Sequence, residues 1–388
     1  MTLPARPGRP GWDRPDWGRP GYGHDWHNRH YWHHNHWHHG WWHRPWRPPY
    51  CWGYWWDRYP YLTAFGLTSW AINRTGWAFG YNSYYNPYAA GAVYIDNSVY
   101  DYSQPIVLAP GEQTLGGDPS NVALSEVPTV SLTAFDTARQ EFYDGNYEAA
   151  LKATDEALKD DPYDAVMHEF RALTFFAMGE YKDSAATLYA VLSVGPGWDW
   201  TTMIGLYPDV ETYTKHLRAL EAYVGDNPTD TSGLFVLSYQ YITAGHDEAA
   251  ATELKRLIKL TPKDPVAIDM LLGVDPEAEL PETPKEIQPP KPSAPVKSDQ
   301  LEGDWKADRD GRQFVMELKP DGTFSWTYTE GDSTQEVTGV WEVDEEGVLA
   351  MQMNDEGVMV AQVLPQGNDK LDFYMVGDTQ GSPPLNFV

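Results

Sequence analysis

Residues 145–162 read Gly-Asn-Tyr-Glu-Ala-Ala-Leu-Lys-Ala-Thr-Asp-Glu-Ala-Leu-Lys-Asp-Asp-Pro. A glycine stands 17 residues before a proline here and twice more, at Gly145 and Pro162, Gly179 and Pro196, and Gly245 and Pro262. Glycine commonly ends a helix, and proline stops the next one. A period near 34 residues is typical of a helix-turn-helix unit that must stack on its neighbours to bury its apolar face. The middle of the chain is therefore predicted to be a helical array.

The residues of these units resemble the tetratricopeptide repeat family. In the first unit Tyr147 packs into the turn and the small Ala150 lets the two helices approach. The second unit has Ser184 at the position of that small alanine. The resemblance implies an α-helical solenoid over residues 131–273, with about four repeats.

The third unit, about residues 199–229, is the weakest match. It has lost the glycine and carries Tyr207-Pro208-Asp209 between its helices, so its first helix is predicted to be short or distorted. The fourth unit regains the pattern, with Gly245 and Ala250. A last helix, about residues 265–272, is expected to cap the stack.

The resemblance implies that partners bind on the concave face, which the first helices of the units make. Only Arg139 lies near the basic pattern of repeats that clamp chaperone tails, so that ligand is disfavoured. The predicted occupant is a protein or peptide partner, a second copy of the chain, or the chain's own aromatic segment around residues 81–102. By repeat register the face includes Phe135, Arg139, Phe142, Tyr143, Glu169, Leu173, Phe176, Phe235, Tyr239 and Ile242.

The first 60 residues form a leader rich in Arg, Pro, Gly, His and Trp, which we expect to be disordered. Nine of the twelve histidines lie in it, where their imidazoles could hold Zn, Ni or Cu. The alternative is a solvated tract that adheres to wall polymer or nucleic acid through Trp and Arg. Cys51 is the only thiol, so nothing fixes a coordination geometry. The candidate ligands are His24, His27, His30, His33, His34, His36, His38, His39 and His43.

Residues 61–130 are aromatic at first and end in a linker from about residue 105. The stretch 62–80 is long enough to span a membrane, but Asn73 and Arg74 in its middle argue against a transmembrane span. Residues 92–102 are predicted to form a hairpin with its turn at Asp96-Asn97. The Asn-Pro-Tyr stretch at 86–88 and the Tyr-rich segment after it resemble a group of exported bacterial proteins that carry such repeats.

The start of the chain leaves two locations open. Residues 1–10 contain no apolar run of the kind that a secretory signal has. A cytoplasmic protein is therefore expected if Met1 is the true start, and an exported or cell-envelope protein if translation begins upstream.

The carboxyl-terminal part follows a Pro-rich linker over residues 274–298. From residue 299 to 388 apolar residues alternate with polar ones, which predicts six or seven antiparallel strands in a small barrel-like domain. Its opening Gly303-Asp304-Trp305 resembles lipocalin-like domains, and the resemblance implies that Trp305 plugs one end. Trp326, Trp341 and Phe373 are expected either to fill the core or to line a cavity for a ligand.

Charge and motifs narrow the function. The formal charge of the chain is -28. The leader has eight Arg and four Asp and is therefore positive, at +4, so the rest of the chain is strongly acidic. That acidic part disfavours nucleic acid and anionic membrane as partners. No nucleophile, phosphate-binding or dinucleotide motif is visible. The sequence predicts a non-enzymatic, multi-domain scaffold for protein binding. The alternatives are a metal-sequestering envelope protein and a carrier or sensor of small apolar ligands.

Overall fold

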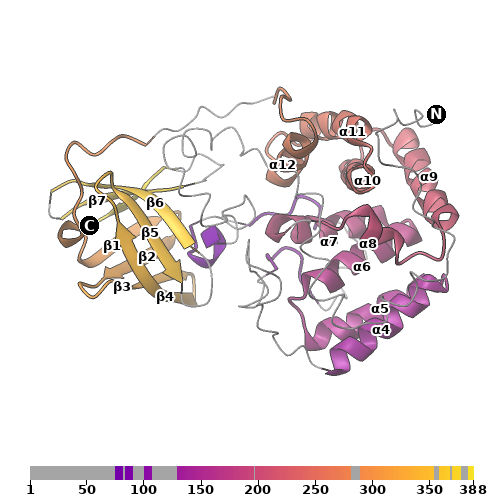
Figure 1. The fold of residues 1–388 in the computed structure, drawn as a ribbon, viewed down its shortest axis with the longest axis horizontal. Helices are drawn as coiled ribbons and strands as arrows, with labels where there is room; N and C mark the ends of the chain where they lie inside the picture. Colours follow the sequence, from indigo (N-terminus) through magenta and orange to yellow (C-terminus); the bar gives the residue numbers. More distant parts are fainter. Residues whose placement is uncertain are drawn as a thin grey trace.

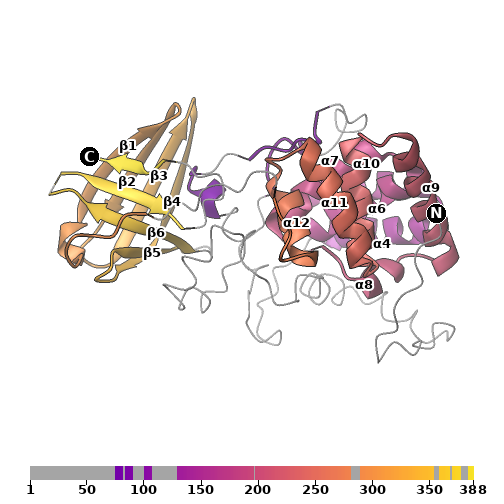
Figure 2. The same cartoon turned by 90° about the horizontal axis from the view of Figure 1, so that it is seen from above.

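The computed structural model describes residues 75–81, 84–90, 100–106, 129–195, 197–280, 289–353, 358–367, 369–376 and 383–388. The predicted leader, its histidines, most of the predicted hairpin, most of the linker before residue 130 and residues 281–288 of the Pro-rich linker lie outside these residues. The described chain contains a helical array and an antiparallel sheet, which occupy opposite ends of the molecule in Figures 1 and 2. The coarse prediction of helices followed by a small β domain is confirmed.

The helical array consists of consecutive antiparallel pairs. Helices α4 and α5 pack together, as do α6 and α7 and then α10 and α11. The third pair is irregular, because α8 has five residues whereas α9 has 17, which confirms the prediction of a short helix there. The bounds are α4 Thr129–Tyr143, α5 Tyr147–Asp160, α6 Ala165–Met178, α7 Tyr181–Val194, α8 Trp200–Ile204, α9 Val210–Asp226, α10 Thr231–Thr243, α11 Asp247–Leu260 and α12 Pro265–Val274.

The recurring glycines and prolines mark the ends of these helices. Gly145, Gly179 and Gly245 all have a positive φ, at 81°, 80° and 72°. After each glycine the next N–H donates to a carbonyl five residues back, as Glu180 does to Phe175 at 2.9 Å. This six-residue closure satisfies carbonyls that would otherwise lack a partner at the helix end. The same cap at three places gives the pairs the same turn.

Three helices, α6, α10 and α12, begin after an aspartate that stands two residues beyond a proline, at Pro162, Pro228 and Pro262. Asp164, Asp230 and Asp264 each accept a hydrogen bond from the N–H three residues on, at 2.9 to 3.0 Å. An aspartate at this position satisfies a donor that the first turn leaves open and also favours the positive end of the helix dipole. The proline and the aspartate together mark the starts of α6, α10 and α12.

Ala150 sits where α4 and α5 meet and is completely buried. Replacing it with leucine is expected to lower the free energy of unfolding by about 1 to 3 kcal/mol, because the crossing has no room for the larger side chain. Denaturant unfolding followed by circular dichroism at 222 nm measures the change. Lys152→Leu on the exposed side of α5 is the control; equal stability of the two variants would contradict this placement of Ala150.

The carboxyl-terminal sheet has eight strands rather than the six or seven predicted, and it is a simple meander in which each strand pairs with the next. It nearly closes on itself, because Lys306 in the first strand exchanges backbone hydrogen bonds of 2.9 and 3.0 Å with Val388. The strands are β1 Gly303–Arg309, β2 Arg312–Leu318, β3 Thr323–Glu330, β4 Ser333–Val343, β5 Val348–Met353, β6 Val358–Pro365, β7 Leu371–Met375 and β8 Leu385–Phe387.

The core of the β domain extends into the predicted linker. Val296, which was assigned to the linker, is buried against the sheet, and its N–H donates to the carbonyl of Glu345 at 3.0 Å. The segment 75–81 from the amino-terminal third also joins this core through Phe79 and Tyr81. The folded β domain therefore includes residues far outside the predicted range of 299–388.

Candidate functional site

The predicted concave face is not an open groove. Of its ten residues only Tyr143 is exposed, and the other nine are buried in the core of the helical array. Phe142, for example, packs edge-on against Tyr207 at 5.0 Å. The chain itself buries these side chains: Tyr207 of the third unit packs on Phe142, and Tyr88 of the upstream aromatic segment packs on Phe235 at 4.7 Å.

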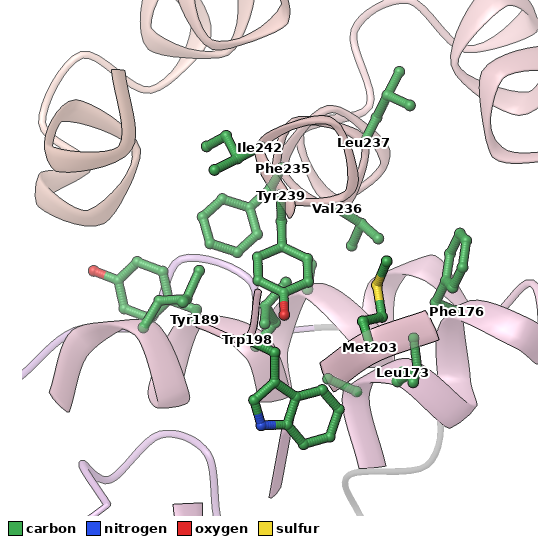
Figure 3. Packing of buried hydrophobic residues seen from close by; sticks show 14 of the residues in the cluster. Leu173, Phe176, Tyr189, Trp198, Met203, Phe235, Val236, Leu237, Tyr239 and Ile242 are labelled. Atoms are coloured by element: carbon green, nitrogen blue, oxygen red, sulfur yellow. The ribbon is translucent and has the colours of Figure 1, made fainter. Parts of the chain in front are cut away.

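Trp198 lies at the start of the third unit. It is 1% exposed and lies with Met203 among residues of α6 and α10, where Figure 3 shows Tyr239 extending toward it. Residues 197–207 contain the short helix α8 and contribute Trp198, Met203, Leu206 and Tyr207 to the core of the array. This region is therefore packed interior rather than an exposed face.

A carboxyl group is buried beneath Trp198. Glu169 on α6 accepts hydrogen bonds at one oxygen from the Trp198 N–H, at 2.7 Å, and from the Tyr239 hydroxyl. Its second oxygen has no hydrogen-bond partner. Burial raises the pKa of Glu169 to about 8, and the nearby Asp199 acts in the same direction. The group holds its proton at neutral pH and is enclosed, so its geometry fits a structural part better than a catalytic one.

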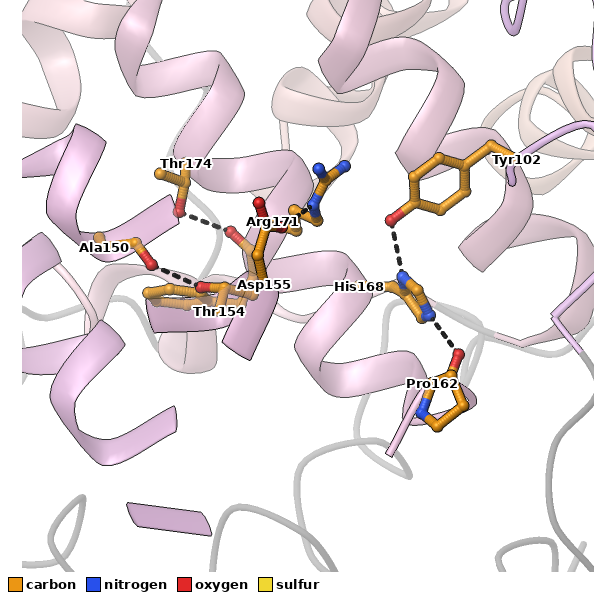
Figure 4. A network of polar contacts seen from close by, with 9 residues as sticks. Tyr102, Ala150, Thr154, Asp155, Pro162, His168, Arg171 and Thr174 are labelled. Atoms are coloured by element: carbon orange, nitrogen blue, oxygen red, sulfur yellow. Dashed lines mark hydrogen bonds and ion pairs between the residues drawn. The ribbon is translucent and has the colours of Figure 1, made fainter. Parts of the chain in front are cut away.

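A second polar pair links the array to the tyrosine-rich segment at residues 100–106. The His168 Nε2–H donates to the Pro162 carbonyl at 2.9 Å, so its Nδ1 accepts from the Tyr102 hydroxyl at 2.7 Å (Figure 4). Burial lowers the pKa of His168 to about 4. The neutral imidazole therefore serves as a fixed acceptor for a tyrosine.

Arg171 also lies beside this tyrosine. Its Nε donates to Asp155 on α5 at 2.7 Å, and its guanidinium lies 5.6 Å from the centre of the Tyr102 ring (Figure 4). Tyr102 is completely buried between this cation and His168. The array thus holds one tyrosine of the upstream segment by its hydroxyl and by its ring face.

The array holds a second tyrosine through Asp264. Tyr88 is 3% exposed, and its hydroxyl donates to Asp264 Oδ2 at 2.6 Å. Its ring lies 4.7 Å from Phe235 of α10 and 5.6 Å from Tyr189 of α7. Asp264 also caps α12, so one carboxylate serves both a helix start and the tyrosine. Burial raises the pKa of Asp264 to about 6, which leaves it ionised at neutral pH.

Asn86 joins the backbone groups of Tyr88 and Tyr102 to α7. Its amide donates to the Ala186 carbonyl of α7 at 2.8 Å and to the Tyr102 carbonyl at 3.1 Å, while its oxygen accepts from the Tyr88 N–H at 3.0 Å. Every polar group of this buried amide is therefore used. The Asn-Pro-Tyr motif, noted in the sequence only as a resemblance, is the part of the segment that contacts the array most specifically.

The named aromatic residues of the β domain are all buried. Trp305, Trp341 and Phe373 are at most 8% exposed, and the Trp305 indole N–H donates to the Leu301 carbonyl at 2.7 Å. Trp326 is completely buried, and its indole N–H donates to the carbonyl of Phe79, a residue of the upstream segment. These rings pack into a core that the chain's own Phe79 completes.

The described residues offer no group of three or more His, Cys, Asp or Glu side chains able to hold a metal ion. The nine candidate histidines of the leader lie outside those residues. Within the described part of the chain there is likewise no helix with the length and apolar character that a membrane span requires.

Comparisons with family models, curated proteins and solved structures found no match to this chain.

The tyrosine-rich segment is recognisable in the sequence, but the residues of the array that hold it are not. Asp264, His168 and Arg171 were missed as binding residues, although the recurring Pro-x-Asp pattern could have marked Asp264 as a helix cap. Its second contact, to Tyr88, spans 176 residues and has no local signal.

Proposed function

We propose that this chain is a non-enzymatic scaffold in which a tetratricopeptide-type array binds extended, tyrosine-rich polypeptide segments. The repeat assignment is supported by the three identical glycine caps and by small buried residues at the crossings. Ser184 replaces the alanine of the second unit, and its hydroxyl donates to the Ala172 carbonyl at 2.9 Å. A buried hydroxyl with a partner is tolerated at a close helix crossing.

The observation that carries the proposal is the way in which the array holds Tyr88. The ring is packed between Phe235 and Tyr189, and the hydroxyl reaches a buried carboxylate. Asn86 adds hydrogen bonds to a helix carbonyl and to the segment's own backbone. Aromatic anchors in pockets with polar contacts to the peptide backbone are typical of peptide recognition. The binding surface proposed here consists of Ala186, Tyr189, Phe235 and Asp264, of which only Phe235 belongs to the predicted concave face.

The test uses the full chain with its own segment weakened by Asn86→Ala and Tyr88→Ala. A fluorescein-labelled peptide with the sequence of residues 84–106 is expected to bind this variant with an affinity about tenfold or more above that for the wild type, whose segment competes. A peptide with Tyr88→Phe is expected to bind about tenfold more weakly, because it lacks the hydrogen bond to a charged acceptor. Fluorescence anisotropy gives both affinities.

Asp264→Asn in the same double variant provides a matched control. It keeps the helix cap but removes the charge, so the difference between the Tyr and Phe peptides is expected to shrink. Circular dichroism verifies that the helices remain. Failure of the peptide to bind a helical double variant would show that the segment is only part of the fold.

A further inference from the structure

A separate site, in the β domain, holds the tripeptide Phe79-Gly80-Tyr81. Three side-chain donors of the barrel reach three consecutive carbonyls of this segment. The Trp326 indole N–H donates to the Phe79 carbonyl at 2.8 Å, Arg312 donates to that of Gly80 at 3.3 Å, and Arg309 donates to that of Tyr81. The tripeptide ends a short helical turn, because the N–H groups of Gly80 and Tyr81 donate back to Trp77 and Gly76. The three barrel side chains therefore pair with carbonyls that this turn leaves open.

The two aromatic side chains of the tripeptide give the site its sequence preference. Phe79 is completely buried, with its ring 5.2 Å from that of Trp326 and 6.2 Å from that of Phe324. The Tyr81 ring lies 6.2 Å from Phe373, and the Arg309 guanidinium lies 4.2 Å from its centre. A cation at this distance is attracted to the face of an aromatic ring. The first and third positions therefore both require aromatic residues.

The middle position accepts only glycine. Gly80 has a φ of 66°, in the left-handed region that side chains disfavour. A Cβ atom at this position would lie 2.4 Å from the ring of Tyr328, which is too close for any contact between carbons. The ring of Tyr328 is thus pressed against the backbone of the segment, and the receptor excludes any larger residue.

We propose that the β domain is a recognition module for aromatic-glycine-tyrosine segments, and that Trp52-Gly53-Tyr54 of this chain is a second ligand for it. The pattern of an aromatic residue, glycine and tyrosine occurs in the sequence twice, at residues 52–54 and at residues 79–81. Trp52 supplies an aromatic residue for the position of Phe79, and Gly53 and Tyr54 match the other two. The two tripeptides compete for one barrel, either within a chain or between copies.

Exchange at this site has a structural consequence. Only residues 82 and 83 separate Tyr81, bound to the barrel, from Tyr84, which packs against Tyr189 of the array. The bound tripeptide therefore tethers the β domain to the helices through a very short connection. When Trp52-Gly53-Tyr54 occupies the barrel, that tether is released. This site lies apart from the tyrosine site on the array and does not depend on the function proposed for it.

The direct test uses the full chain with Gly53→Ala and Gly80→Ala, which disables both internal ligands and leaves every barrel residue unchanged. The probe is a fluorescein-labelled peptide of residues 48–58 with Cys51→Ser. Saturable binding is expected, about tenfold or more tighter than to the wild type, whose Phe79-Gly80-Tyr81 competes. The same peptide with Gly53→Ala is expected to bind about tenfold or more weakly. Equal affinity for the two peptides would overturn the proposal.

A second measurement on the wild-type chain guards against a variant that fails to fold. The N–H of Gly80 donates to Trp77 at 2.9 Å and that of Tyr81 donates to Gly76 at 2.8 Å, so both amides are protected from exchange while the segment is docked. Excess unlabelled glycine peptide is expected to speed hydrogen exchange at residues 76–81, whereas the alanine peptide leaves it unchanged. Unaltered exchange at saturating glycine peptide would also overturn the proposal. Sedimentation at several protein concentrations distinguishes exchange between copies from exchange within one chain.

Discussion

Replacing Trp198 with alanine is expected to lower the free energy of unfolding of the helical array by about 3 to 5 kcal/mol. The indole is 1% exposed and fills the space among α6, α8 and α10 that the short third unit leaves. Truncation removes its apolar contacts and leaves a cavity that the surrounding helices close only in part. Denaturant unfolding followed by circular dichroism at 222 nm measures the effect.

Leu260→Ala serves as the control for this prediction. Leu260 lies at the end of α11 and is 44% exposed, so its truncation is expected to cost less than about 1 kcal/mol. The hydrogen bond from the Trp198 N–H to Glu169 is donated by the backbone, so the alanine variant retains it. If the two variants unfolded at the same denaturant concentration, residues 197–207 would not be the segment that fills the predicted groove.

The helical array could be predicted because the residues that specify each helix end lie close together in the sequence. Gly145, Gly179 and Gly245 each need a left-handed conformation, and that requirement is visible in a single residue type. The alternation of Phe314, Met316 and Leu318 likewise predicts which face of a strand is buried, and all three side chains are buried. Such signals depend on residues a few positions apart, so a single sequence is enough to predict the elements that they specify.

The sequence left open what covers the predicted face, because the contacts that cover it join residues far apart in the chain, such as Tyr88 and Phe235. The register placed Glu169 and Tyr239 on the facing first helices, and the two side chains do meet. The repeat register did not place Trp198 on this face, because Trp198 belongs to the irregular third unit, whose first helix is short. Phe79 is a similar case, because its contact with Trp326 joins residues 247 positions apart. The hydrophobic pattern identifies a residue as buried but does not identify its partner.

Asp264 was not predicted, although half of its role has a local signal. Its place two residues after Pro262 is typical of a helix start, and it caps α12 in the structure. Its hydrogen bond to Tyr88 joins residues far apart in the chain, and no periodicity indicates that contact. A local rule could therefore have identified the first role, while the second depends on the assembled fold.

The free energy of unfolding is expected to fall as the pH rises from 5 to 7.5, in part because of Glu169. Burial raises the pKa of this carboxyl from its ordinary value of 4.5 to about 8 in the folded chain. Between these values the unfolded chain releases a proton that the folded chain retains, so increasing pH favours unfolding. The stabilisation is fully present below pH 4.5 and is lost as the pH passes through 8. Over the window from pH 5 to 7.5 the Glu169 contribution is about 3 kcal/mol.

Glu169→Gln isolates this contribution, because the amide cannot ionise and its oxygen can still accept from Trp198 and Tyr239. Asp264 and His168, whose pKa values are about 6 and about 4, titrate in both proteins and cancel in the difference. Denaturant unfolding at pH 5, 6, 7 and 7.5 is expected to show the variant gaining stability relative to the wild type as the pH rises. Parallel curves for the two proteins would mean that Glu169 is ionised in the folded chain and that water reaches it beneath Trp198.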